Sequence, residues 1–236
     1  DFDTPKHIKD QAIKAINDGF TKYTQVDGIP ELKKSIITKF ESENDLKYDL
    51  DQITVGVGGK HVIYNLFMST LNKNDEVIIP APYWVSYQDM VNLAGGKPII
   101  LETEMKDNFK IIPKQLEANI SEKTKWFIIN SPGNPTGTVY DKSELKEISK
   151  VLLKNPHVNI LSDDIYEHIT YGTKFYNVLN VEPKLYENTF IVNGVSKAFS
   201  MTGWRIGYGA GKKELIKAMS KIQSQSTTNP LSLIHI

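Results

Sequence analysis

The sequence contains no cysteine, which excludes disulfide bonds, thiolate metal sites and a cysteine nucleophile. It also has no apolar run long enough to form a membrane-spanning helix. Its first residues do not show the charged and apolar regions of a secretory leader, and none is expected. Neither sign of charge is in excess, because 28 Lys and Arg residues balance 28 Asp and Glu residues, and no basic block occurs. Nucleic acid and membranes are therefore poor candidate partners, and we expect a cytoplasmic location.

The composition is otherwise that of a globular protein, with 40% hydrophobic and 24% charged residues in a chain of 236. This length suffices for one large or two modest domains. In a first predicted helix, Asp3 or Thr4 is expected to be the cap, Pro5 to lie in the first turn and Gly19 to end it. A second helix is predicted over Ile29–Ser42, where apolar residues recur at helical spacing.

Short apolar runs alternate with helical patterns from residue 53 onward. This alternation is typical of βαβ units, and it predicts an α/β fold with a mainly parallel sheet covered by helices on both faces, in three α/β/α layers. Because ligands of such sheets bind beyond the carboxyl ends of the strands, the residues that follow each strand are candidates for the site. The predicted strands are 53–57, 76–79, 98–101, 125–129, 158–161 and 189–192, and the predicted helices among them include 61–71, 83–93 and 143–153.

The segment Asn193–Gly207, NGVSKAFSMTGWRIG, follows the last predicted strand and carries two cations. Lys197 stands in a turn of small residues. Arg205 is flanked by Gly203 and Gly207, so that backbone on either side can approach a ligand closely. Two cations at one strand end suggest an anionic ligand. The alternative is an ordinary surface loop, since most lysines are solvated.

A glycine-rich turn, Gly58-Gly59-Lys60, follows the first strand of the predicted sheet and precedes a helix. Glycines at such a turn let backbone N–H groups point at an anion, and the helix dipole adds to the attraction. The spacing is neither GxxxxGK[ST] nor GxGxxG. A phosphate-type cradle and a plain tight turn are both open interpretations.

Two further strand ends carry an aromatic ring and an amide. Trp84, in APYWVSY, can stack on a planar ring or pack against the core. Asn134 lies in the loop SPGNPTG, Ser131–Gly137, where Pro135 restricts its backbone. It either presents its amide to a ligand or belongs to a rigid turn.

The fifth predicted strand leads into SDDIYEH, which contains Asp163, Asp164 and Tyr166. An acidic pair after a strand can cap a helix or bind magnesium. His168 is expected to be a surface or packing residue, because no second set of residues at metal-ligand spacing accompanies it. Tyr23, in KYTQVDG, is either a half-buried loop anchor or a ligand contact.

Taken together, the strand ends supply an anion cradle, an aromatic plate, an amide, a carboxylate, a tyrosine and two cations. Pyridoxal 5′-phosphate is one ligand that would use all of them. With the motifs SPGNPTG, SDDIYEH, NGVSKAFSMTGWRIGY and SQSTTNP, the chain resembles the class I aminotransferases of fold type I, most closely the bacterial aspartate aminotransferases. The resemblance covers residues 3–230 and implies a pyridoxal phosphate cofactor, amino acid and 2-oxo acid substrates, and a homodimer.

The resemblance also implies roles for the residues that handle the reacting groups. Lys197 would bond to the cofactor aldehyde and later carry the proton to and from the substrate Cα. Asp163 would keep the pyridine nitrogen protonated, with Asp164 as a structural neighbour. Tyr166 and Asn134 would share the phenolic oxygen of the cofactor, and Asn134 would also reach the substrate carboxylate.

The remaining implied roles concern binding. Trp84 would stack on the cofactor ring and contact the substrate, and Tyr23 would reach the phosphate held by a neighbouring subunit. No metal is expected. The residues expected to hold the phosphate are Gly58, Gly59, Lys60 and Arg205, with Ser196 as an addition.

By the same resemblance, residues 1–230 would form the cofactor-binding large domain. The N-terminal arm and the smaller C-terminal domain, with the arginine that binds the substrate carboxylate, would lie outside this chain. Residues 231–236, LSLIHI, are expected to be a non-native tail. Turnover by these residues alone is expected to be incomplete, because substrate positioning supplies much of the rate.

The favoured reaction is reversible transfer of an amino group between aspartate and 2-oxoglutarate. Within the same family, a prephenate or aromatic amino acid aminotransferase is an alternative. A pyridoxal phosphate-dependent lyase or decarboxylase on the same fold is another, and it would release ammonia or carbon dioxide. A non-enzymatic alternative is the aminotransferase-like sensor domain of a transcription regulator, which would carry a DNA-binding module upstream.

Overall fold

The computed structural model describes residues 2–228 and 230, so the predicted tail at 231–236 lies outside the described residues. The chain divides into two compact units, which we call the terminal unit (Asp1–Ser69 with Val192–Ile236) and the central unit (Thr70–Ile191). The strands of the described residues follow the sheet order β1-β7-β6-β5-β4-β2-β3, and β6 passes from the central into the terminal unit. The strands are β1 Ile53–Val57, β2 Glu76–Ala81, β3 Lys97–Glu102, β4 Thr124–Asn130, β5 Asn159–Asp163, β6 Thr189–Gly194 and β7 Ile206–Ala210.

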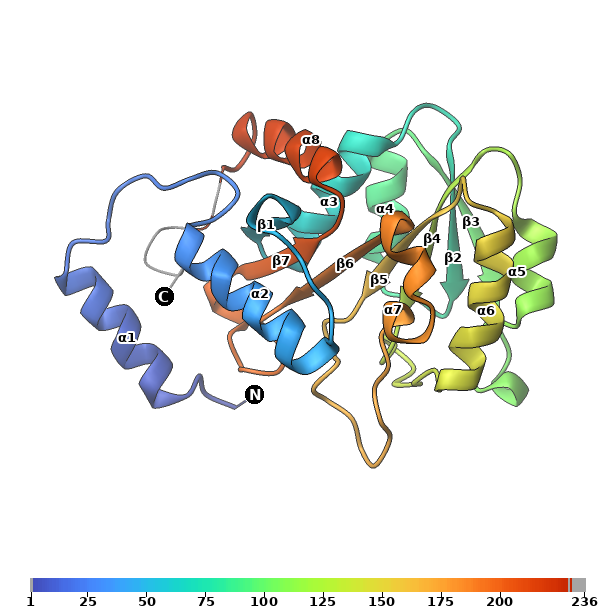
Figure 1. Ribbon diagram of the computed structural model, residues 1–236, viewed down its shortest axis with the longest axis horizontal. Coiled ribbons are helices and arrows are strands. Elements are labelled where there is room, and N and C mark those ends of the chain that lie inside the picture. The colour runs from blue at the N-terminus through green and yellow to red at the C-terminus, as the bar shows by residue number, and fades with distance from the viewer. Residues whose placement is uncertain (1, 229, 231–236) are drawn as a thin grey trace. The chain divides into compact units, whose positions relative to one another are not determined.

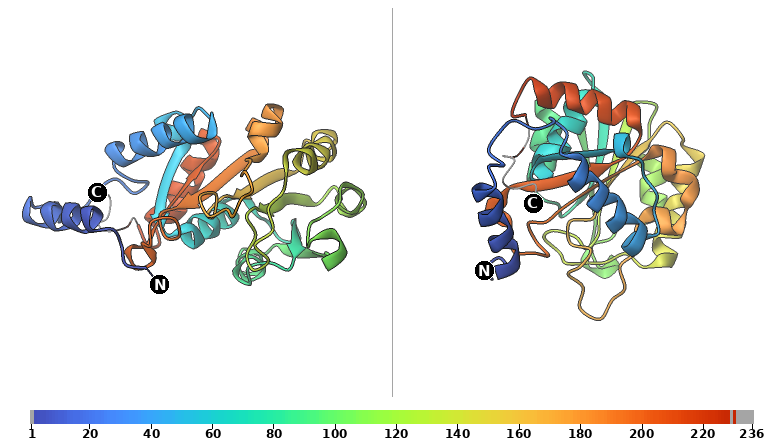
Figure 2. Two further views of the ribbon diagram at one scale, coloured as in Figure 1. Left: turned by 90° about the horizontal axis from the view of Figure 1, so that it is seen from below. Right: turned by 60° about the vertical axis from the view of Figure 1, so that its left-hand side comes forward.

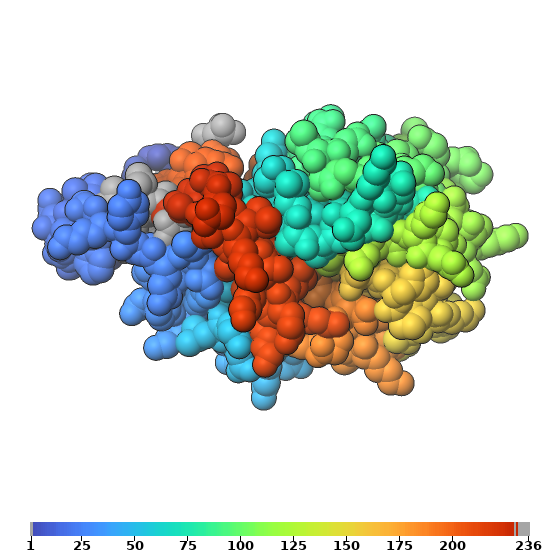
Figure 3. Space-filling model, turned by 90° about the horizontal axis from the view of Figure 1, so that it is seen from above, coloured from blue at the N-terminus to red at the C-terminus, as the bar shows by residue number. Residues whose placement is uncertain are grey.

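The terminal unit contains the antiparallel pair β1 and β7. Consecutive residues of β1 point to opposite faces, and both faces are covered, because Val55 packs on Gly28 whereas Gly56 packs on Val62 of α3. Figures 1 and 2 show α2 on one side of these strands and α3 on the other. The surface of α8 is seen in Figure 3. The helices of this unit are α1 Lys6–Asn17, α2 Pro30–Asn44, α3 Gly59–Thr70 and α8 Lys213–Ser224, with 3-10 turns at Leu50–Gln52 and Thr202–Trp204.

Aromatic rings attach α2 to the strands of the terminal unit. Phe40, which is fully buried, makes edge contacts with Tyr48 at 5.1 Å and with Tyr208 of β7 at 6.0 Å between ring centroids. Such pairs contribute about 0.5–1.5 kcal/mol each beyond the burial of their surface. They fix the helix over the strand pair whose ends carry the candidate site.

The central unit contains parallel strands. β2 pairs with both β3 and β4, and β4 pairs with β5. Val77, Ile78 and Ile79 of β2 are fully buried, as expected for a strand covered on both faces. Figures 1 and 2 show α4 on one face of these strands and α6 with α7 on the other. The helices are α4 Ser86–Leu93, α5 Pro113–Asn119, α6 Lys142–Lys154 and α7 Val178–Val181, with 3-10 turns at Met105–Asp107 and Pro183–Asn188.

The predicted fold class, an α/β fold with a mainly parallel sheet and helices on both faces, is confirmed. The six predicted strands are present, most of them longer than predicted by one or two residues. The sequence reading missed β7, α5, α7 and α8, and the β1–β7 pair is antiparallel. No helix within residues 2–228 combines the length and the apolar character that a membrane crossing needs.

The prediction for the start of α1 was wrong. Pro5 is the N-cap of the helix, and no side chain makes a capping hydrogen bond there. The Thr4 hydroxyl instead donates to the carbonyl of Ser200, 2.7 Å away. Asp3 pairs with Lys9 at 2.5 Å. Both side chains named as caps are therefore bonded elsewhere.

Candidate active site

The turn between β1 and α3 has the form of an anion-binding turn. Gly58 adopts a positive φ of 85°, which favours glycine, and α3 begins at Gly59. The first N–H groups of a helix have no partner within the helix and carry its positive dipole end. Lys60 is exposed in this first turn. A small anion would therefore meet backbone N–H groups together with a cation here.

Arg205 lies directly on this turn. Its Nη1 donates to the carbonyl of Thr202 at 2.9 Å, and its Nη2 to the carbonyl of Val57 at 3.4 Å. A Cβ added to Gly58 would overlap Nη2 of Arg205. The arginine thus occupies the space that a side chain at position 58 would need.

Gly207 of β7 packs against the same turn from the neighbouring strand. A Cβ added to Gly207 would overlap the backbone nitrogen of Gly59 and the backbone carbon of Gly58. The absence of side chains at positions 58 and 207 is thus what permits this close approach. We call Gly58, Gly59, Arg205 and Gly207 the glycine–arginine cluster.

Lys197 stands on the turn that joins β6 to β7 in the terminal unit, and its side chain is exposed. The turn is closed by backbone bonds from Met201 N–H to the Ser196 carbonyl at 3.2 Å and from Ser200 N–H to the Lys197 carbonyl at 3.3 Å. Ser196, half-buried, directly precedes the lysine. The terminal unit therefore holds the predicted phosphate-binding residues and the predicted amine.

Asp163 is the last residue of β5 in the central unit, and it is only 5% exposed. Its Oδ2 accepts a hydrogen bond from the Tyr87 hydroxyl at 2.5 Å, and its Oδ1 accepts one from the Ile165 N–H at 3.3 Å. Burial raises the pKa of the Asp163 carboxyl from its ordinary value of 3.8 to about 6, although both hydrogen bonds act to lower it. A cation beside this carboxyl would stabilise its ionised form.

Tyr87 is a site residue that the sequence analysis missed. Burial, followed by the charge of Asp163, raises the pKa of its hydroxyl well above the usual range, so Tyr87 is a neutral donor. Its ring meets that of Trp84 edge-on, with 5.3 Å between centroids and 86° between planes. Tyr87 thus contacts both the candidate aromatic plate and the candidate carboxylate. Its position three residues after Trp84 places it on α4, where an aromatic residue reads as core.

Asn130, the last residue of β4, was also missed. Its Oδ1 accepts the N–H of Asn134 at 2.8 Å, and its Nδ2 donates to the carbonyl of Asp163 at 2.9 Å. One side-chain amide therefore fixes the positions of two predicted cofactor ligands relative to each other. Its place at a strand end is the signal that could have identified it.

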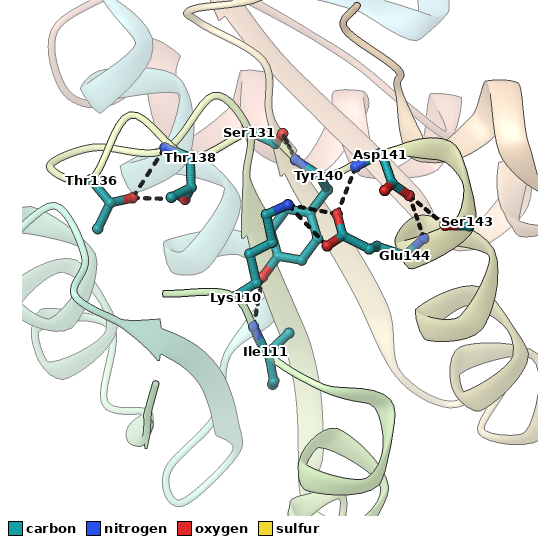
Figure 4. Close-up of polar contacts among 9 residues, drawn as sticks. All are labelled: Lys110, Ile111, Ser131, Thr136, Thr138, Tyr140, Asp141, Ser143 and Glu144. Atoms are coloured by element: carbon teal, nitrogen blue, oxygen red, sulfur yellow. Dashed lines mark hydrogen bonds and ion pairs between the residues drawn. The ribbon is translucent and has the colours of Figure 1, made fainter. Parts of the chain in front are cut away.

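The loop that carries Asn134 is held from both sides (Figure 4). Ser131 Oγ accepts the N–H of Tyr140 at 3.1 Å, and the Tyr140 hydroxyl accepts the N–H of Ile111 at 2.9 Å. Beside them, Lys110 forms a bidentate ion pair with Glu144 at 2.9 and 2.7 Å. These contacts tie the loop to the start of α6 and to the segment after β3.

The remaining predicted residues differ in exposure. Asp164 is buried, and its carboxylate accepts hydrogen bonds from Ser162 at 2.7 Å and from Asn177. Tyr166 is half-buried on the turn after β5. The Tyr23 side chain is 102% exposed, which excludes the interpretation as a half-buried anchor within the described chain.

Each unit therefore brings together a different part of the predicted site. In the terminal unit, Gly58, Gly59 and Arg205 are in contact, and Ser196 precedes Lys197 on one turn. In the central unit, Asp163 is linked through Asn130 to Asn134 and through Tyr87 to Trp84.

A mainly parallel α/β fold with polar residues at the carboxyl ends of its strands is that of the large domain of fold type I enzymes. The family model described as aminotransferase class I and II matches residues 1–234, and the chain belongs to this family.

Curated relatives of this family are similar over nearly the whole chain. The probable aspartate/prephenate aminotransferase of Rickettsia bellii (strain RML369-C) is 63% identical over 237 residues, which cover 100% of this chain and 59% of the relative. The aspartate/prephenate aminotransferase of Cereibacter sphaeroides (strain ATCC 17029) is 58% identical over 99% of this chain and 58% of its own length. The chain thus spans 59% and 58% of the lengths of these two relatives.

Solved structures of aspartate aminotransferases are also similar to this chain. The aspartate aminotransferase from Rhizobium meliloti matches with a TM-score of 0.98 and 50% identity, over 100% of this chain and 59% of that structure. An aspartate aminotransferase from Thermus thermophilus with maleate matches with a TM-score of 0.95 and 43% identity, over 100% of this chain and 60% of that structure.

Proposed function

We propose that the protein is a pyridoxal 5′-phosphate-dependent aminotransferase that exchanges an amino group between aspartate and 2-oxoglutarate. One observation supports the choice of cofactor most directly, namely the buried Asp163 carboxyl at the end of β5, whose pKa is raised to about 6. A protonated pyridine nitrogen is the partner that would stabilise this carboxylate in its ionised form.

The residues present fit this cofactor. The cofactor carries a phosphate, and the first turn of α3, which begins at Gly59, offers backbone N–H groups beside the Arg205 guanidinium. It also carries a flat ring, for which Trp84 is a half-buried stacking partner. When bound, the cofactor supplies an aldehyde that takes up the amino group and a ring that accepts electrons.

In this proposal the terminal unit binds the phosphate and moves a proton. Arg205, Gly58 and Gly59 bind the phosphate oxygens, with the Ser196 hydroxyl as an addition. Lys60 adds a second positive charge that attracts the phosphate. Lys197 would hold the cofactor through its aldehyde, and its amine would carry a proton to and from the substrate Cα.

The central unit orients the ring and keeps it charged. The Asp163 carboxylate holds a proton on the pyridine nitrogen, which maintains the ring as an electron acceptor. Tyr166 and Asn134 hydrogen-bond to the phenolic oxygen, and the Asn134 amide also orients the substrate carboxylate. Trp84 stacks on the ring and limits access of water to it.

Tyr23 is proposed to contact the phosphate bound by a second copy of the protein, which would make the active form a homodimer. Its full exposure within the described chain leaves the phenol available for such a contact. The cytoplasmic location, the domain limits at residue 230 and the non-native tail stay predictions.

The substrate proposal draws on the relatives. The Rhizobium meliloti protein, 50% identical, is named an aspartate aminotransferase. The names of the relatives at 63% and 58% identity add prephenate, so prephenate is the second candidate 2-oxo acid. These names do not favour the lyase or the transcription-regulator alternatives.

The test begins with the protein expressed from its complete coding sequence and mixed with pyridoxal 5′-phosphate. We expect a new visible absorbance band, and after borohydride reduction a mass increase on the peptide that contains Lys197. Aspartate should then transfer its amino group to 2-oxoglutarate, and a parallel assay with prephenate tests the second candidate.

Lys197→Ala is the decisive variant, and Lys213→Ala, which removes an exposed lysine of α8, is its matched control. The control should keep both the trapped adduct and the activity, whereas Lys197→Ala should lose both. If Lys197→Ala retains them, the assignment is wrong.

A further inference from the structure

Thr4 lies beside the turn that carries Lys197, although the two are far apart in sequence. Its buried hydroxyl donates to the Ser200 carbonyl at 2.7 Å and accepts from the indole Nε1 of Trp204 at 3.0 Å. We propose that Thr4 is a positioning residue, whose hydroxyl holds the Lys197–Arg205 turn in the shape that binds the cofactor. This inference rests on the proposed function.

Two residues of this turn have strained backbone. Ser200 has a φ of +53° and Arg205 a φ of +59°, which residues with a side chain rarely adopt. Such conformations persist only where surrounding contacts hold them. The first lies three residues after Lys197, and the second is itself the proposed phosphate ligand.

The Thr4 hydroxyl makes a hydrogen bond at or next to each strained residue. It bonds to the carbonyl of Ser200, and it bonds to the indole of Trp204, the residue directly before Arg205. A hydroxyl has one proton to donate and lone pairs to accept with, so a single group connects the two ends of the segment 200–204. A valine at position 4 would keep the shape but leave both partners without this bond.

The helix start supports this role. Pro5 occupies the N-cap of α1, and no side chain makes a capping bond there, so Thr4 is not required to begin the helix. The hydroxyl is directed at a turn almost 200 residues away in sequence. The competing explanation is that Thr4 only fastens the start of the chain to the terminal unit, without effect on the site.

The first experiment measures the turn itself, by NMR hydrogen exchange of the Trp204 indole N–H in the wild type, Thr4→Val and Thr4→Ser. We expect exchange about tenfold faster in Thr4→Val, the size expected for one lost buried hydrogen bond, and near-normal exchange in Thr4→Ser. The indole of Trp126, which donates to Thr70 Oγ1 at 3.0 Å in the central unit, is the internal reference and should not change. Unchanged exchange at Trp204 in Thr4→Val would overturn the proposal.

The second experiment measures the consequence for the site, as affinity for pyridoxal 5′-phosphate and as the rate of borohydride trapping at Lys197. Thr4→Val should bind about tenfold more weakly and trap more slowly, and Thr4→Ser should recover both. Thr38→Val is the matched control, because the Thr38 hydroxyl makes an exposed bond within α2 to the Lys34 carbonyl. It should bind like the wild type.

A third variant separates positioning from general loss of stability. Glycine adopts positive φ without strain, so Ser200→Gly added to Thr4→Val should restore part of the affinity if strain in the turn is the cause. No recovery in the double variant, or equal affinity of Thr4→Val and wild type, contradicts the inference. Failure of the wild type to bind the cofactor contradicts the proposed function instead, and the exchange experiment still decides whether Thr4 holds the turn.

Discussion

The two units prepare for a ligand in opposite ways. In the terminal unit the glycine–arginine cluster depends on its backbone, because glycine leaves room for close approach. The two cations of this unit that belong to the predicted site, Lys197 and Arg205, are exposed. In the central unit a buried carboxyl, Asp163, accepts hydrogen bonds from the Tyr87 hydroxyl and the Ile165 backbone N–H. The first arrangement is therefore disrupted by adding atoms, and the second by removing a donor or a charge.

The largest effect is expected from Gly207→Ala. The added methyl group would overlap backbone atoms of Gly58 and Gly59, which cannot rotate away as a side chain can. We expect a loss of about 4 kcal/mol in the free energy of unfolding, at the upper end for overpacking, together with loss of binding to pyridoxal 5′-phosphate. Urea denaturation and a cofactor titration measure the two effects.

Gly203→Ala is the matched control for this substitution. It lies two residues before Arg205, but a Cβ there would meet no atom within 4 Å of it. Its free energy of unfolding should change by less than about 0.5 kcal/mol. Equal losses of stability in Gly207→Ala and Gly203→Ala would show that the close approach of Gly207 to Gly58 and Gly59 does not hold the cluster together.

Asp163→Asn should show a pH-dependent effect in the cofactor-free protein. Because the folded-state pKa of Asp163 is raised from 3.8 to about 6, the folded protein favours the protonated carboxyl. The contribution of Asp163 to the free energy of unfolding is therefore fully present below pH 4 and is lost as the pH rises through 6. The shift corresponds to about 3 kcal/mol, at 1.36 kcal/mol for each pH unit. The wild type loses this stability between pH 3 and pH 8, whereas asparagine does not titrate. The free energy of unfolding of Asp163→Asn minus that of the wild type should thus rise by about 3 kcal/mol from pH 3 to pH 8.

Denaturation curves of both proteins at a series of pH values measure this difference. Binding of pyridoxal 5′-phosphate at pH 8 should stabilise the wild type more than Asp163→Asn, because the wild type gains an ion pair that asparagine cannot form. A difference between the two proteins that does not depend on pH would contradict the raised pKa.

Tyr87→Phe should have a smaller effect of related origin. Loss of the hydroxyl removes a bond that lowers the pKa of Asp163, so the pKa of Asp163 should rise above 6. We expect Tyr87→Phe to destabilise the cofactor-free protein by about 1 kcal/mol more at pH 8 than at pH 3. A carboxyl NMR titration of Asp163 measures the shift directly.

Tyr83→Phe is the control for Tyr87→Phe. The Tyr83 hydroxyl bonds to Gln88, and it is not among the groups that shift the pKa of Asp163. The Asp163 titration should be the same in this variant as in the wild type. A shift of equal size in both variants would show that Asp163 responds to general loosening of the region and not to its hydrogen bond.

The sequence predicts best those site residues that follow a predicted strand. The alternation of apolar runs and helices predicted the α/β fold. Asp163 became a candidate for the site because it follows the predicted strand 158–161, and ligands bind beyond the carboxyl ends of such strands. β7 was missed because two of the five residues of IGYGA are glycine, so that it does not read as an apolar run. Tyr87 was missed because a buried aromatic residue on a helix reads as core.

Hydrogen bonds between distant segments were the part that local patterns could not predict. Thr4 has the sequence context of a helix cap, yet its partners are Ser200 and Trp204. Asn130 directly follows the predicted strand 125–129 and was not singled out, yet its amide joins the Asn134 loop to β5. In both cases the side chain is short and polar, and only the fold determines which of its possible partners it meets.

The smallest effect on stability is expected from Tyr23→Phe. This variant tests whether the phosphate bound by the terminal unit is also contacted by Tyr23 of a second copy of the protein. Because the Tyr23 side chain is fully exposed in the described chain, loss of its hydroxyl should change the free energy of unfolding by less than about 0.5 kcal/mol. If Tyr23 contacts the phosphate held by a second copy, cofactor affinity should fall in Tyr23→Phe only at protein concentrations where sedimentation shows dimers. Thr21→Val, two residues earlier on the same exposed loop, should leave that affinity unchanged. A loss of affinity in Tyr23→Phe that persists in the monomer would assign the phenol to the cluster of its own chain.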